Sequence, residues 1–336
     1  MPVLYRTLDT HECAYTYENE GKNVRQGIDI HDPALEQAYA YAEAHQYDDA
    51  IAEVENYVAC HQEIDPRIHV RLMKLLVDWY AQDQHFAQAR RYAAQAARIA
   101  HERLEPHDEL ALIARNSDLY WKCVCGYDDI ARRDYPTLIR DAEKYLGNHH
   151  PLTYAIRNNS AMPFKICGDY EQAAQKYAEL KEEMNEDAEC DGSLKTMVAF
   201  NEAEAYALSG HPEKSTEIYQ ELIENIDMSK ESSRIYALRI RHEIAANIYD
   251  SGEVEKATQM WNALLHECRE TLGEYHPLTM KQKMLHISLF IAQKDWVAVK
   301  KLCAEILESP ENTLPSGWRE EIEVIMKTPP PMDLPH

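Results

Sequence analysis

The strongest constraint in this sequence is a repeat period of 42 residues. Four of the ten glycines follow it, namely Gly126, Gly168, Gly210 and Gly252. Two more positions keep the same spacing with apolar or small residues: Ile68, Leu110, Leu152, Leu194, Tyr236 and Leu278, and Ala89, Ala131, Ala173, Ser215, Ala257 and Val299. A fixed period in this range is typical of stacked helical units, none of which buries its apolar face alone. The period therefore predicts an all-α solenoid of antiparallel helix pairs.

The unit at 151–189 shows how one period forms a helix pair. Pro151 is suited to the first turn of a helix, so the first helix is predicted over Leu152–Cys167. Gly168 supplies the left-handed residue that ends many helices. A second helix is then predicted over Tyr170–Met184.

The turn between the two helices carries a recognisable motif. Its order is small, aromatic, Gly, aromatic and Ala, as in Ala161, Phe164, Gly168, Tyr170 and Ala173. This motif resembles the tetratricopeptide repeat, whose usual unit is about 34 residues. The longer unit here, with Leu-Gly-x-x-His-Pro-x-Thr at 146–153 and 272–279, resembles the repeats of kinesin light chains and of many bacterial tetratricopeptide proteins. The resemblance implies a right-handed superhelical α-solenoid. HEAT and armadillo repeats share the period but lack this turn.

Seven repeats are predicted, with atypical segments at both ends of the chain. The repeats cover about 31–62, 67–105, 109–147, 151–189, 193–231, 235–273 and 277–309. Residues 1–30 are predicted to be an irregular segment that packs on the first repeat, or alternatively lies in the groove as a self-ligand. A capping helix over 315–327 and a mobile Pro-rich tail over 328–336 are predicted to follow.

The composition narrows the possible partners. A net charge of −23, from 35 basic and 58 acidic residues, argues against nucleic acid, whose phosphates need Lys and Arg. The acidic excess serves solubility, or it favours partners with basic segments. No apolar run reaches the length of a membrane span, and the N-terminus lacks a signal-peptide pattern, so no membrane contact is predicted. Eight dispersed cysteines favour a reducing, cytoplasmic setting.

Asparagines at matching repeat positions are the main candidate ligand contacts. First helices line the concave groove of tetratricopeptide arrays, and Asn159 and Asn201 lie where kinesin-light-chain-type repeats carry groove asparagines. The resemblance implies that they hydrogen-bond the backbone of an extended peptide, since an amide both donates and accepts. Asn116 and Asn158 share the neighbouring position. The alternative is that all four buttress neighbouring helices.

Further residues are predicted to point into the same groove. Lys165 and Tyr120 lie at inward positions of the first helices. Arg239, His242 and Lys281 form a predicted cluster that could accept an acidic side chain or a terminal carboxylate. Salt bridges to nearby glutamates are the alternative for this cluster.

Catalytic and metal-binding motifs are missing from the sequence. It contains no Walker loop, His-Glu-x-x-His, Gly-x-Ser-x-Gly or Cys-x-x-Cys. A zinc site could be drawn from Cys123, Cys125 and Cys167 with His149 and His150. Cysteine also serves as a small buried residue in helical repeats, so neither a metal nor a cofactor is predicted.

These observations predict a non-catalytic scaffold or adaptor that holds a peptide segment of a partner in its concave groove. The alternative is a bacterial signalling-peptide sensor whose superhelix changes conformation on binding. An enzyme without a recognisable motif is the remote alternative. The sequence leaves the partner, the pathway and the oligomeric state open.

Overall fold

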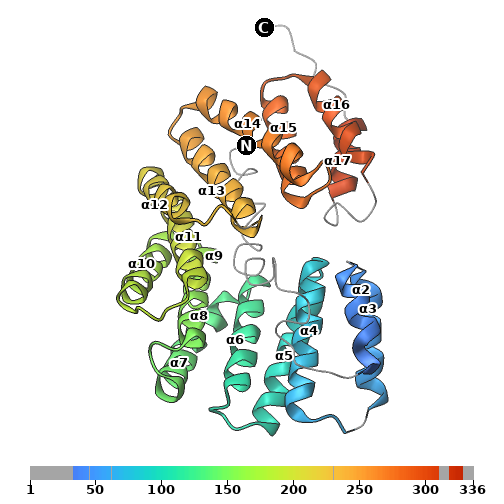
Figure 1. Cartoon of the computed structure of the whole chain (residues 1–336), viewed down its shortest axis with the longest axis vertical. Coiled ribbons are helices and arrows are strands. Elements are labelled where there is room, and N and C mark those ends of the chain that lie inside the picture. The colour runs from blue at the N-terminus through green and yellow to red at the C-terminus, as the bar shows by residue number, and fades with distance from the viewer. Residues whose placement is uncertain (1–32, 45, 62, 230, 310–317, 328–336) are drawn as a thin grey trace. The chain divides into compact units, whose positions relative to one another are not determined.

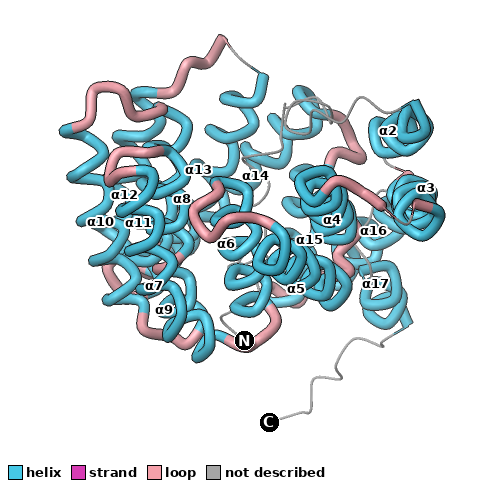
Figure 2. Tube along the Cα trace, turned by 90° about the horizontal axis from the view of Figure 1, so that it is seen from below, coloured by secondary structure: helices cyan, strands magenta, loops and turns pink. Residues whose placement is uncertain are grey.

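The structure is a computed structural model of the 336-residue chain that describes residues 33–44, 46–61, 63–229, 231–309 and 318–327. The predictions for residues 1–30 and for the tail at 328–336 lie outside these residues. The described residues form helices and loops without a strand (Figure 2). None of the described helices is long and apolar enough to span a bilayer.

The chain divides into two compact units, residues 33–224 and the residues from 225 onward. The helices of the N-terminal unit are η1 (Pro33–Leu35), α2 (Glu36–Glu43), α3 (Tyr47–Cys60), α4 (Pro66–Gln82), α5 (Phe86–Arg103), α6 (Glu109–Val124), α7 (Asp128–Leu146), α8 (Pro151–Asn159), α9 (Met162–Ile166), α10 (Tyr170–Glu186), α11 (Gly192–Leu208) and α12 (Pro212–Asn225). Successive helices of this unit pack side by side, as in α4 with α5 and α10 with α11 (Figure 1).

The C-terminal unit contains two long helix pairs and a short last helix. Its helices are α13 (Glu231–Asp250), α14 (Val254–Leu272), α15 (Pro277–Ala292), α16 (Trp296–Leu307) and α17 (Trp318–Lys327). α17 packs on α16 through Ile322, which is fully buried. The sequence predicted a capping helix over 315–327, and α17 covers 318–327 of that range.

The 42-residue period is visible in the backbone of the turns inside six helix pairs, from α4–α5 to α15–α16. Residues 84, 126, 168, 210, 252 and 294 all have positive φ, between 57° and 89°. Four are glycines, whereas Gln84 and Lys294 adopt the same left-handed conformation with a side chain. At Gly168 the turn is closed by hydrogen bonds from Gly168 N to Lys165 O and from Asp169 N to Phe164 O. This is the Schellman arrangement that satisfies the last carbonyls of a helix.

A repeated ion pair ties the first helix of a pair to the second. Arg157 makes a bidentate contact with Glu183 at 2.6 Å for both bonds, and Arg241 contacts Glu267 in the same way at 2.8 Å. Arg115 contacts Asp141, also at 2.8 Å. The partners are 26 residues apart in all three cases, and the arginines follow the 42-residue period. This repeated ion pair was not predicted from the sequence.

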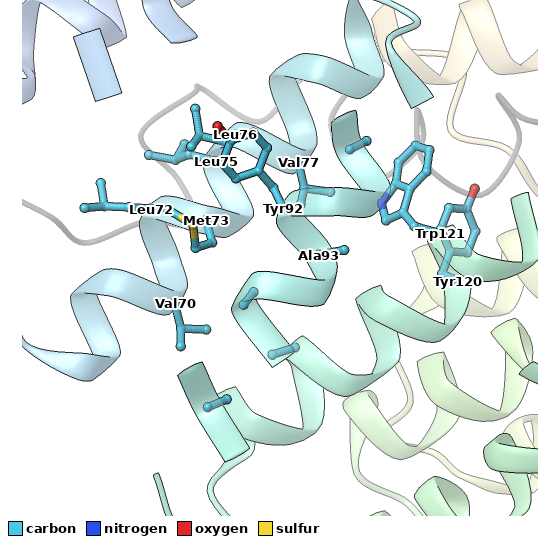
Figure 3. Close-up of a cluster of buried hydrophobic side chains, with 14 of the residues drawn as sticks. Val70, Leu72, Met73, Leu75, Leu76, Val77, Tyr92, Ala93, Tyr120 and Trp121 are labelled. Carbon is cyan, nitrogen blue, oxygen red and sulfur yellow. The ribbon is translucent and has the colours of Figure 1, made fainter. Parts of the chain in front are cut away.

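The core lies between the helices of each pair and between neighbouring pairs. The small or apolar residue that recurs every 42 residues, from Ala89 in the second repeat to Val299 in the seventh, is fully buried in all six repeats. Figure 3 shows part of the core of the N-terminal unit, in which α4 contributes Leu72 and Leu76 and α6 contributes Trp121. Small residues at the helix crossings let the backbones approach, and larger residues fill the space around them.

The predicted continuous helix over Leu152–Cys167 is wrong. It is broken into α8 and α9, with a turn at Ser160 and Ala161 between them. Pro163 is the cause, because proline has no N–H to bond the carbonyl four residues earlier and its ring clashes with that turn. The prediction followed the apolar period and overlooked this proline.

Candidate functional site

The candidate residues of the N-terminal unit lie on first helices that stack on one another. α4 packs against α6, and α6 packs against both α8 and α9. Equivalent residues of neighbouring repeats are therefore close in space, and polar side chains at matching positions can hydrogen-bond across the stack.

The four candidate asparagines form one hydrogen-bonded chain across α6, α8 and α11. Asn201 Nδ2 donates to Asn158 Oδ1 at 3.0 Å, and Asn158 donates to Asn159 at 3.1 Å. Asn159 Nδ2 then donates to Asn116 Oδ1 at 3.4 Å. Each amide is thus oriented by the next one, and hydrogen bonds in such chains polarise each other.

The two ends of this chain differ in exposure. Asn158 and Asn201 keep only 1% and 3% of their surface in water, whereas Asn116 and Asn159 are half-buried. Buried amides need hydrogen-bond partners, and here they are partners for each other. Asn116 and Asn159 keep part of their surface in water. Contact of all four with a peptide stays a prediction.

Lys165 and Tyr120 are buried rather than open to solvent. Lys165 Nζ donates to Glu204 Oε2 at 2.6 Å, and the two side chains are 5% and 10% exposed. This ion pair joins α9 to α11. Tyr120 packs edge-on against Trp121, with ring centroids 5.4 Å apart.

The candidate residues of the C-terminal unit lie on α13 and α15. Arg239 and Lys281 are half-buried and His242 is buried. Nδ1 of His242 lies 3.0 Å from Nε2 of Gln282, so the neutral ring accepts a hydrogen bond there. The ring of His242 also lies beside Trp261, with centroids 6.0 Å apart.

Gln282 belongs to a buried polar network that was not predicted from the sequence. His286 Nδ1 donates to the Gln282 carbonyl at 2.7 Å, and His286 Nε2 lies 3.0 Å from Oδ1 of Asn262. Burial lowers the pKa of His286, which favours the neutral ring. Nε2 is then an acceptor, so Asn262 must turn its NH₂ group toward it. A polar residue at 282 is unusual at a repeat position that is Ile156, Val198 and Ile240 elsewhere, and this was the available signal.

Lys281 should make the stability of the chain depend on pH. Burial lowers its pKa to about 7, whereas an unfolded lysine titrates near 10.4. Between these values the unfolded state binds more protons, so stability should rise with pH by up to ~1.4 kcal/mol per pH unit. Below about pH 7 both states are protonated and the dependence vanishes.

The measurement is urea denaturation of wild type and Lys281→Met from pH 6 to about pH 10. The variant should be relatively most stable at and below about pH 7, and its advantage should shrink steadily toward pH 10. The exposed Lys300, replaced in the same way, should show no such trend. A difference between Lys281→Met and wild type that stays constant with pH would contradict the expectation.

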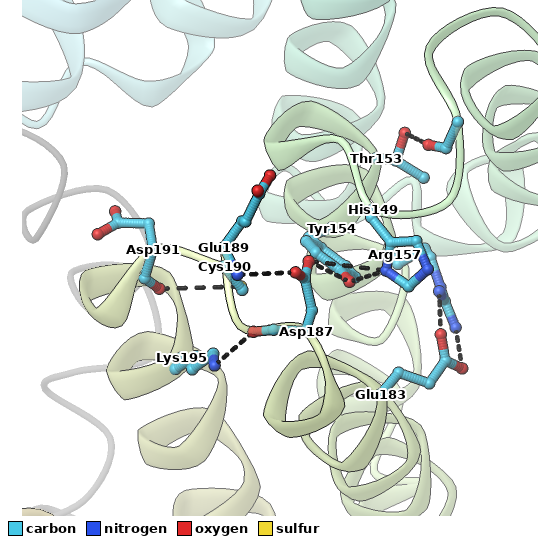
Figure 4. Close-up of polar contacts among 11 residues, drawn as sticks. His149, Thr153, Tyr154, Arg157, Glu183, Asp187, Glu189, Cys190, Asp191 and Lys195 are labelled. Carbon is cyan, nitrogen blue, oxygen red and sulfur yellow. Dashed lines mark hydrogen bonds and ion pairs between the residues drawn. The ribbon is translucent and has the colours of Figure 1, made fainter.

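The loops between repeats hold a second polar cluster, shown in Figure 4. Tyr154 OH donates to Asp187 Oδ2 at 3.1 Å, and His149 Nδ1 lies 2.7 Å from the same hydroxyl. Burial and the Asp187 contact raise the pKa of Tyr154 to about 12, so it keeps its proton. His150 accepts a hydrogen bond from Leu152 N at 3.2 Å and caps α8. These loop histidines thus serve as hydrogen-bonding groups.

The cysteines and histidines considered as a possible zinc site do not come together in the structure. Cys123 and Cys125 lie at the end of α6, beside the start of α7, whereas His149 follows the end of α7. α7 has 19 residues and is therefore roughly 28 Å long. Within the described residues, no group of three or more His, Cys, Asp or Glu side chains is arranged to hold a metal ion. The cysteines of this part of the chain are free thiols.

No protein-family model matches the sequence, and no curated protein sequence matches it. Solved structures do match its fold. The protein NprR, solved in complex with its cognate peptide NprX, is 12% identical with a TM-score of 0.53, over 96% of each chain. BtubC (BKLC) from P. vanneervenii is 18% identical with a TM-score of 0.52, over 73% of this chain and 95% of BtubC.

A third similar structure contains nearly identical TPR-like repeats of a putative kinesin light chain from Podosopora anserina. It is 15% identical with a TM-score of 0.51, over 62% of this chain and 99% of the other. At such low identity the likeness concerns the fold. The chain therefore has the fold of the tetratricopeptide-type helical repeat proteins, as its turn motif predicted.

Proposed function

We propose that this chain is a non-catalytic scaffold that binds a protein or peptide segment along the first helices α6 and α8. The observation that carries this proposal is the asparagine chain, in which two buried amides hold two half-buried amides in place. Such preorganisation lowers the ordering cost of binding. The fold supports the same class of function, because helical repeats present extended binding surfaces.

The chemistry of an amide suits the main chain of an extended peptide. Asn116 Oδ1 accepts from Asn159, and the hydrogen-bond chain ends at Asn116, whose NH₂ group is oriented by that contact. Asn116 can therefore donate to a peptide carbonyl, and Asn159 can offer its remaining hydrogen-bonding capacity beside it. Main-chain contacts of this kind bind many sequences, so specificity must come from neighbouring side chains.

Charge indicates the kind of partner. With a net charge of −23 the surface attracts basic segments and repels nucleic acid. We infer that Arg239 and Lys281 of the C-terminal unit bind an acidic side chain or chain end of the partner. A carboxylate placed beside Lys281 would favour the charged form of this lysine, whose pKa is lowered by burial. The free thiols of the described residues fit a reducing compartment such as the cytoplasm.

The proposal is tested by panning a peptide-phage library on the immobilised full chain and titrating the enriched peptides by calorimetry. Asn116→Ala/Asn159→Ala should weaken binding of those peptides by roughly tenfold or more, because about two net hydrogen bonds are lost. Asn148→Ala, an exposed asparagine in the α7–α8 loop, serves as the matched control and should bind like wild type. Equal affinities for all three proteins would place the binding surface elsewhere.

A peptide sensor is the second candidate function, and one observation favours it. The first helix of the fourth repeat is broken immediately after Asn158 and Asn159. Ligand contact at these residues would act next to a discontinuity in the backbone. A sensor requires that ligand binding change the conformation of this unit.

A further inference from the structure

The α8–α9 break weakens the backbone at one level of the N-terminal unit. The other long first helices, α4, α6 and α11, run for 16 or 17 residues without interruption. At the break, Ala161 N bonds Asn158 O at 3.2 Å, a tighter i to i−3 contact, and Pro163 cannot donate to Asn159 O.

A second interior proline lies beside this break. Pro136 is inside α7, where it removes one more helical hydrogen bond. One turn earlier on α7, Arg132 stacks on the Phe164 ring of α9, with its guanidinium carbon 4.4 Å from the ring centroid. α7 is antiparallel to α8 and α9, so residues one turn after Arg132 face residues one turn before Phe164. The two prolines therefore interrupt neighbouring helices at about the same level.

α11 spans the break and is attached to both sides of it. Asn201 bonds Asn158 at the end of α8, whereas Glu204, about one turn further along α11, bonds Lys165 on α9. A change in the angle between α8 and α9 would separate one of these contacts, and the ion pair is the more costly one to open because it would leave two buried charges without partners.

We propose that the α8–α9 junction, together with Pro136, is a hinge in the N-terminal unit, and that the Lys165–Glu204 ion pair is the latch that holds it closed. Opening the latch changes the angle between the repeats before and after the junction. Asn158 and Asn159 end α8, so a segment bound there would bias the hinge. This last coupling rests on the proposed function, whereas the hinge itself does not.

The hinge is tested in the full chain by pulsed electron spin resonance. Spin labels are placed as non-canonical amino acids at two exposed positions of the N-terminal unit, Ala94 on α5 and Gln220 on α12. Glu204→Gln keeps the shape of the latch but removes its charge, and it should broaden the distance distribution. Pro163→Ala allows α8 and α9 to join, and it should narrow the distribution.

Amide hydrogen exchange provides a second measurement. In Pro163→Ala, exchange of residues 160–165 should slow by at least about fivefold, because helical hydrogen bonds are regained. The control is Pro151→Ala, in which the replaced proline begins the same helix and interrupts no interior hydrogen bond. It should leave both the distance distribution and the exchange of 160–165 unchanged.

Unchanged distance distributions in both Glu204→Gln and Pro163→Ala would overturn the hinge and leave the junction as a rigid kink. If Pro163→Ala does not fold, the Glu204→Gln distribution alone decides the question. No peptide enters these measurements, so the hinge can fail while the peptide titrations succeed, and the reverse.

Discussion

Replacing Lys165 by Met is expected to lower the free energy of unfolding by about 3–5 kcal/mol. The substitution leaves the carboxylate of Glu204 in a site where only 10% of its side-chain surface reaches water, without the ammonium group that now lies 2.6 Å away. The desolvation cost of a buried charge is large once its partner is removed. Urea denaturation followed by circular dichroism measures the loss.

Two controls separate the ion pair from simple truncation. The double replacement Lys165→Met/Glu204→Met removes both charges and should recover most of the stability, since apolar pairs can replace buried ion pairs at little cost. Arg98→Met, which breaks an exposed pair with Glu102, should cost no more than about 0.5 kcal/mol. A loss for Lys165→Met no larger than that of Arg98→Met would show that water reaches the pair.

Replacing Trp261 by Ala should cost about 3–5 kcal/mol in the C-terminal unit. Trp261 is the largest fully buried side chain among the described residues. Its ring lies 6.0 Å from that of His242 and 5.6 Å from that of Tyr249, so its removal also leaves these rings without support. Calorimetry of the full chain should show the C-terminal unit melting at a lower temperature.

The matched control is Tyr275→Ala, which removes an aromatic side chain that is 44% exposed in the same unit. Its effect should be clearly smaller than that of Trp261→Ala, because 44% of Tyr275 already lies in water and less apolar surface is buried there on folding. If both variants lost the same free energy of unfolding, the prediction would be wrong, because neighbouring side chains would then have filled the space left by Trp261.

The sequence predicted the fold best at positions where the backbone needs a particular conformation. From the second repeat to the seventh, the left-handed residue of the turn recurs every 42 residues, and glycine marks four of these six positions. At the equivalent positions of the second and seventh repeats, Gln84 and Lys294 adopt the same positive φ without glycine. The small residue at each crossing was also predictable, since only a small side chain permits that approach.

The candidate site was less predictable. The repeat period selected the asparagines, but the bonds between repeats join residues 43 apart, one residue off the period. Whether a side chain at such a position reaches the next helix depends on the rotation between repeats. Two of the predicted contacts, Asn158 and Asn201, are consequently buried, and Lys165 lies in an ion pair.

The sequence by itself determined that this chain forms paired helices with a 42-residue period and a tetratricopeptide-type turn, because turn conformation and the burial of a small residue are local requirements. Only the tertiary structure decided where the stack divides, which asparagines stay accessible and which charges pair. These depend on the angle and rotation between neighbouring repeats, which arise from many side-chain contacts together and are encoded in no single repeat.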